Sequence, residues 1–84
     1  MLETYREEIN QIDSQIIALF AQRFEIVKKI GEYKKEQGLP IRNPEREAAL
    51  LKTLVTEAAK VGISEQFVED VWGRMFLESY RIES

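Results

Sequence analysis

The sequence predicts an all-α chain of three helices, the first of them much longer than the others. The first observation is a set of apolar residues spaced three or four positions apart, as on one face of a helix: Ile9, Ile12, Ile16, Leu19, Phe20, Val27 and Ile30. The second is a scarcity of helix breakers, because no proline precedes Pro40 and Gly31 is the only glycine before Gly38. With no strand pattern, repeat or linker, residues 1–84 are expected to form a single domain.

The first helix, expected over residues 1–37, is too long for a compact monomer. It begins near Met1 or at a Thr4 cap, and about 35 helical residues span roughly 50 Å. A compact chain of this length is only about 25–30 Å across. The rest of the chain cannot cover such a helix, so we expect an intertwined helical homodimer related by a two-fold axis.

Helix stop and start signals define the second helix. Gly38 suits a left-handed cap, and Pro40 cannot continue the first helix. Asn43 is expected to cap a second helix that begins at Pro44 and runs to about Lys60. Its inner face is expected to hold Leu50, Leu54, Ala58 and Val61.

The third helix is expected to follow a short turn. Gly62 closes the second helix, and Ser64 caps a third helix from Glu65 to about Ile82. Its buried stripe is expected to comprise Val68, Val71, Trp72, Met75 and Phe76.

Gly31, inside the first helix, is interpreted as a point of close packing rather than a break, since the apolar pattern continues beyond it.

The composition excludes several kinds of chemistry. The chain has no cysteine and no histidine, which removes a thiol nucleophile, the usual general base and the usual zinc ligands. We expect no metal site. A net charge of −3, with 12 basic and 15 acidic residues interleaved, indicates no attraction to nucleic acid or membrane. No apolar run resembles a signal peptide or a membrane span, so a cytoplasmic protein is expected.

Polar residues interrupt the inward faces of all three helices. At about 100° per residue, Arg23 and Lys34 lie within roughly 40° of Ile9 on the apolar stripe, and Arg6 lies at its edge. The other two helices place four more on their inward faces: Arg46, Glu47, Ser79 and Glu83. Buried cations are costly unless negative groups meet them. Together these residues predict a pocket for a small dianion, working by electrostatics and positioning.

Each of these residues also has a purely structural interpretation. Arg23 could pair with Glu47, Lys34 could extend to water, and Arg6 alone could be a surface charge. Glu83 lies next to the end of the chain, where helices fray. A helical dimer with ordinary salt bridges therefore remains an alternative.

Several stretches are similar to a known family: residues 5–9, 12–13, 19–23 and 31–34, the run from Gly38 to Glu47, and Ser79. The chain resembles the all-helical chorismate mutases over essentially its whole length. The resemblance implies an intertwined dimer of three-helix chains that rearranges chorismate to prephenate without a cofactor. It implies that Arg23 and Arg46 hold the substrate carboxylates, joined by Ser79 and by Arg6 of the other subunit.

The resemblance also implies the groups that act on the other oxygens of the substrate. Lys34 would donate a hydrogen bond to the ether oxygen, and Glu47 would accept one from the ring hydroxyl. Asn43 stands where aspartate is frequent beside that hydroxyl, with a modest expected effect. Glu83 stands where glutamine is a second donor to the ether oxygen. An ionised carboxylate cannot donate, so turnover is expected to improve below neutral pH.

Three alternatives stay open. Relatives on the same fold would eliminate pyruvate from isochorismate or rearrange the amino analogue of chorismate. A non-catalytic helical dimer that serves docking or regulation would tolerate substitution of the inward cations. An enzyme that is weak alone could also require a partner enzyme of the shikimate route.

Overall fold

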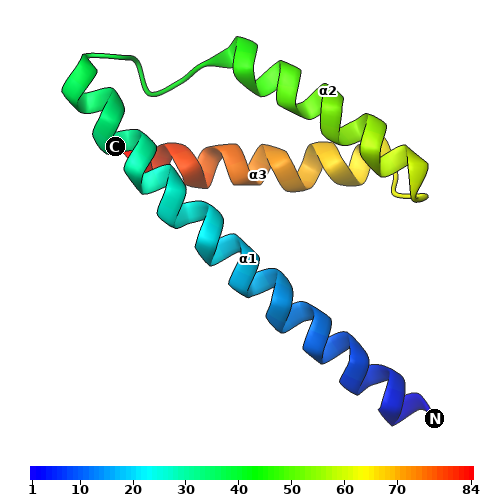
Figure 1. The fold of residues 1–84 in the computed structure, drawn as a ribbon. Helices are drawn as coiled ribbons and strands as arrows, with labels where there is room; N and C mark the ends of the chain where they lie inside the picture. The colour runs from blue at the N-terminus through cyan, green and yellow to red at the C-terminus, as the bar shows by residue number, and fades with distance from the viewer.

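The computed structural model describes all 84 residues and contains three helices and no strand. Helix α1 spans Leu2–Gln37, α2 spans Pro44–Lys60 and α3 spans Glu65–Glu83 (Figure 1). The all-α, three-helix prediction is confirmed. The boundaries differ from the sequence prediction by one residue at the start of α1 and one at the end of α3.

Helix α1 runs far beyond the other two helices. In Figure 1 its N-terminal half projects away from α2 and α3, and the chain measures 55 × 24 × 15 Å. No side chain caps its start at Met1, so the alternative Thr4 cap is not realised. At the other end Gly38 adopts φ 67°, and its N–H and that of Leu39 bond the last carbonyls. This left-handed cap is the one that the sequence predicts.

Helices α2 and α3 are fixed by the predicted N-caps. The Asn43 side chain accepts a hydrogen bond from the Arg46 N–H at 3.1 Å, with Pro44 at the first helical position. The Ser64 hydroxyl accepts from the N–H of Phe67 at 3.1 Å. Each bond satisfies one of the free N–H groups at a helix start.

The turn between α2 and α3 corrects one prediction. Val61 lies just beyond the last residue of α2 and is 72% exposed, so its assignment to the inner face is wrong. Gly62 follows with φ 79° and turns the chain toward α3. The helical wheel was extended one residue too far, into the turn.

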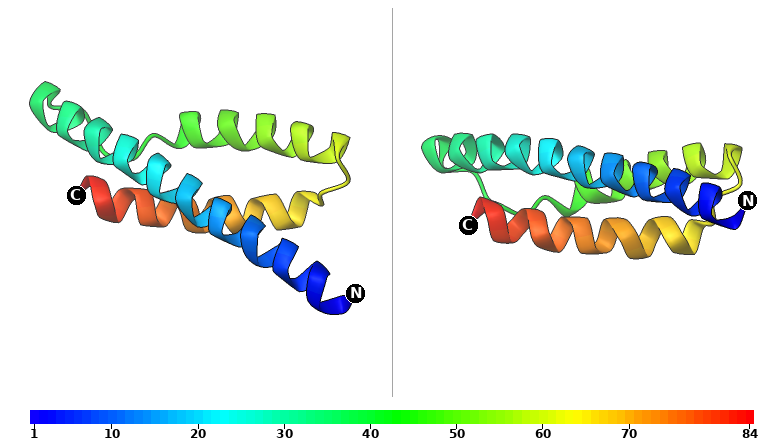
Figure 2. Two further views of the ribbon diagram at one scale, coloured as in Figure 1. Left: turned by 60° about the horizontal axis from the view of Figure 1, so that its bottom comes forward. Right: turned by 90° about the horizontal axis from the view of Figure 1, so that it is seen from below.

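The core is small and is centred on α3. Helix α3 packs against both α1 and α2, whereas α1 and α2 do not pack against each other (Figure 2). The buried apolar residues are Val27, Ala58, Val68 and Met75. The predicted stripe of α1 is exposed in its N-terminal half, at 55% for Ile9, 49% for Ile12 and 41% for Ile16. No helix is long and apolar enough to cross a membrane.

Candidate active site

A cavity of about 250 Å³ lies where the C-terminal ends of α1 and α3 meet the start of α2. Its polar lining includes all the predicted site residues except Arg6: Arg23, Lys34, Asn43, Arg46, Glu47, Ser79 and Glu83. Its remaining walls are formed by Val27, Ile30, Ile41, Leu50, Phe76 and Tyr80. The fold thus brings together polar residues that are up to 60 positions apart in the sequence.

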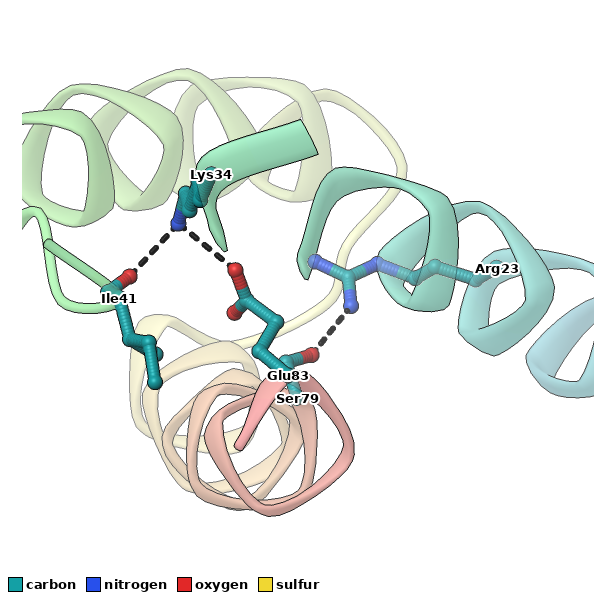
Figure 3. A network of polar contacts seen from close by, with 5 residues as sticks. All are labelled: Arg23, Lys34, Ile41, Ser79 and Glu83. Carbon is teal, nitrogen blue, oxygen red and sulfur yellow. Dashed lines mark hydrogen bonds and ion pairs between the residues drawn. The ribbon is translucent and has the colours of Figure 1, made fainter. Parts of the chain in front are cut away.

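Lys34 is held between the α1–α2 connection, residues 38–43, and the end of α3. Its Nζ donates to the carbonyl oxygen of Ile41 at 2.6 Å and to Oε1 of Glu83 at 2.7 Å (Figure 3). The Lys34 side chain is 21% exposed and that of Glu83 only 6%. Lys34 therefore does not extend to water, and Glu83 is part of α3 rather than frayed. An ammonium has three N–H donors, so one remains for another acceptor.

Arg23 meets a hydroxyl instead of a carboxylate. Its Nη1 donates to the buried Oγ of Ser79 at 3.1 Å (Figure 3). Arg23 forms no ion pair with Glu47. The pKa of Arg23 is lowered, first by burial and second by the positive charge of Arg46. Both causes disfavour the charged guanidinium. An anion in the cavity would reverse this penalty.

Glu47 provides the one buried side-chain oxygen that lacks a partner. Its Oε1 is shielded from solvent and has no hydrogen bond within the chain. An unsatisfied buried acceptor costs about 1–3 kcal/mol. A donor on a molecule in the cavity would remove that cost.

Asn43 has a structural task beside its position in the cavity. Its Oδ1 is engaged by the Arg46 N–H, so the amide orients the first turn of α2, which carries Arg46 and Glu47.

Arg6 stands apart from the cavity of its own chain. It lies exposed near the start of α1, in the part of the helix that projects away from α3 (Figure 1). One chain alone therefore does not bring Arg6 to the other site residues.

Sequence reasoning missed two contributors to the site. The carbonyl of Ile41 anchors Lys34, and a backbone acceptor leaves no side-chain signal in the sequence. The Tyr80 ring lines the cavity, and the Arg42 guanidinium carbon lies 4.9 Å from its centroid. Tyr80 could have been predicted to line the site, because it directly follows Ser79 and precedes Glu83 by three residues on the same helix.

The site has the character of an anion-binding pocket in a small helical protein. Three cations line it beside one buried carboxylate oxygen that lacks a partner, and about half of the lining residues are apolar. Nowhere in the chain do three or more residues of metal-binding type gather closely enough to hold an ion.

The chain belongs to the chorismate mutase type II family, whose model matches residues 5–84. It is 46% identical over 83 residues to a T-protein of Haemophilus influenzae and 40% identical over 83 residues to one of Enterobacter agglomerans. These matches cover 99% of this chain but only 22% of either relative. A chorismate mutase of Methanocaldococcus jannaschii is 41% identical over 46 residues, 55% of this chain and 46% of that protein.

Proposed function

We propose that this chain rearranges chorismate to prephenate, a step in the biosynthesis of phenylalanine and tyrosine. The observation that carries the proposal is the cavity, where Arg23, Lys34 and Arg46 converge beside the unpartnered oxygen of Glu47. Membership of the chorismate mutase type II family supports the same reaction. The relatives named as chorismate mutases or T-proteins are consistent with it.

The arginines bind the two carboxylates of the substrate. Burial first, and the positive charge of Arg46 second, lower the pKa of Arg23, so an anion between the two guanidinium groups would relieve both. Ser79, which already receives a hydrogen bond from Arg23, orients that side chain toward the cavity. Binding both carboxylates holds the flexible substrate in a compact conformer ready to react.

Lys34 and Glu83 act on the ether oxygen, where negative charge develops as the C–O bond breaks. The third N–H of Lys34 is the donor, and its fixed bonds to Ile41 and Glu83 limit the reorganisation needed. Glu83 becomes a second donor when it is protonated. Glu47 accepts from the ring hydroxyl, which satisfies its buried oxygen. No covalent intermediate forms in this reaction.

We further propose that the site is completed by a second copy of the chain, with Arg6 contributed across the subunits. The support is the apolar N-terminal half of α1, where Ile9, Ile12 and Ile16 remain 41–55% exposed within the chain. A two-fold pairing of α1 would cover them and carry the partner's start of α1 toward the cavity. The cytoplasmic location and a partner enzyme of the shikimate route stay predictions.

The test is loss of chorismate absorbance with the purified protein, with products separated by chromatography. Prephenate as the product supports the proposal. Turnover of isochorismate or of the amino analogue, but not of chorismate, would replace it with one of the related reactions. The absence of turnover on all three would favour the non-catalytic helical dimer.

A matched pair of lysine variants makes the test specific. Lys34→Ala removes a cation from the cavity, whereas Lys35→Ala removes an exposed neighbour on the same helix. We expect Lys34→Ala to lose at least about a hundredfold in kcat, in the range found for groups that stabilise a developing oxyanion. Lys35→Ala should keep full activity. Equal effects of the two variants would contradict the site assignment.

A further inference from the structure

We propose that Gly31 is a positioning residue: its missing side chain lets the last turn of α3 lie against α1, which places the Glu83 carboxylate on Lys34. The inference rests on the proposed function and adds a residue that does not line the main cavity. Gly31 touches neither the substrate nor the reacting atoms. It acts through Glu83.

The close approach leaves no room for a side chain at position 31. Gly31 is buried, and a Cβ built on it would lie 2.9 Å from the Cα of Glu83. The same Cβ would lie 3.2 Å from both Cβ and Cγ of Glu83. The nearest atom belongs to the backbone, which cannot rotate away as the end of a flexible side chain can. Any other residue at this position must therefore displace the end of α3.

Backbone conformation does not explain this glycine. Gly31 lies inside α1 and, unlike Gly38 and Gly62, has no positive φ. Glycine is a poorer helix former than alanine, so its presence weakens α1 locally. The benefit is the approach of α3. By contrast, a Cβ on the other helical glycine, Gly73, would meet no atom within 4 Å.

One residue, Glu83, links this close contact to the site. Its Cα lies against Gly31, and its Oε1 accepts from Lys34 Nζ at 2.7 Å, one turn further along α1. The Ser79 hydroxyl, one turn earlier on α3, contacts Arg23, eight residues before Gly31. Displacing the last turn of α3 therefore separates Glu83 from Lys34 while leaving the carboxylate-binding end in place.

The experiment compares kcat and KM for five proteins: wild type, Gly31→Ala, Glu83→Ala, the double variant and the control Gly73→Ala. Measurements are made at pH 5 and at pH 7.5. We expect Gly31→Ala to lower kcat by about tenfold, the value of one charge-assisted hydrogen bond, with KM changed less than about threefold. Gly73→Ala should stay within about twofold of the wild type.

The double variant separates positioning from general damage. Once the Glu83 carboxyl is removed, Gly31→Ala should lower kcat by no more than about twofold further. A purely structural role of Gly31 would lower kcat equally with and without the carboxyl, and would overturn the proposal. A kcat equal to that of the wild type in either Gly31→Ala or Glu83→Ala would also overturn the proposal.

Two further measurements keep this result distinct from the proposed function. If the wild type does not turn over chorismate, the proposed function fails. Crystal structures then decide the positioning claim, since Gly31→Ala should separate Lys34 Nζ from Glu83 Oε1 beyond hydrogen-bond distance. Circular dichroism should show a folded Gly31→Ala protein, because Glu83 ends α3 and its turn can move. A variant that does not fold would overturn the proposal.

Discussion

Replacing Glu83 with glutamine should make the enzyme faster at neutral pH and remove its dependence on acid. The Glu83 carboxylate is 6% exposed and accepts a hydrogen bond from Lys34 at 2.7 Å. While it is ionised, it can only accept, and it adds a negative charge to a site for a dianion. An amide of nearly the same shape keeps the acceptor for Lys34 and supplies a donor.

The size of the effect follows from the hydrogen bond that is gained. A bond to a charged group contributes about 1.5–3 kcal/mol, which corresponds to about a 10–150-fold change in rate. We therefore expect Glu83→Gln to exceed the wild type by at least about tenfold in kcat/KM at pH 7.5. The difference between the two proteins should become smaller as the pH is lowered, since a protonated acid donates as the amide does.

The substitution also has a cost that can be measured separately. It converts the Lys34–Glu83 ion pair into a hydrogen bond with a neutral acceptor, while Lys34 keeps its bond to Ile41. We expect the free energy of unfolding to fall by about 1 kcal/mol, between the values for exposed and buried pairs. Urea unfolding provides this number.

The assay is the initial rate of chorismate loss at pH 5 and pH 7.5, with prephenate quantified by chromatography. A wild-type rate that is the same at both pH values, together with a Glu83→Gln rate that is no higher, would refute the reasoning. Glu83 would then serve only to hold Lys34.

Three further predictions follow from the site and the fold. Arg23→Met should lower kcat/KM at least about a hundredfold without loss of stability in urea, because burial and Arg46 disfavour the charge of Arg23. Arg23 stays charged at ordinary pH despite its lowered pKa, so any gain in the free energy of unfolding should be the same between pH 5 and 9. If the variant does not fold, Arg23 is needed for the fold rather than for the site. Arg42→Ala should reduce the free energy of unfolding by about 0.5–1 kcal/mol through loss of its contact with Tyr80, whereas Tyr80→Phe should not. The Arg6→Ala and Lys34→Ala proteins, each inactive alone, are mixed in equal amounts, unfolded and refolded together. If subunits share sites, up to about a quarter of wild-type activity should return, because about half of the dimers are mixed and each of these has one intact site. If each chain acts alone, no activity should return.

The sequence predicted the helices and their caps with little error, because each depends on local chemistry. Asn43 and Ser64 cap helices because of what their own side chains can accept. The helical wheel placed Arg23 and Lys34 on an inward face, and both line the cavity. It could not identify their partners, since a wheel fixes directions within one helix but not the distances between helices. Arg23 therefore met Ser79 rather than Glu47, and the Ile41 carbonyl was not foreseen.

The exposed start of α1 has a consequence for the hydrogen exchange of this protein. A helix segment that buries little apolar surface is held mainly by its local helix–coil equilibrium, which is marginal in water for a short segment. In a single chain, the amide protons around Ile9 and Ile12 should therefore exchange far faster than those around Val68 and Met75. If the exchange of the amide protons around Ile9 and Ile12 slows as the protein concentration rises, the extent of slowing measures the free energy with which a second molecule covers the helix.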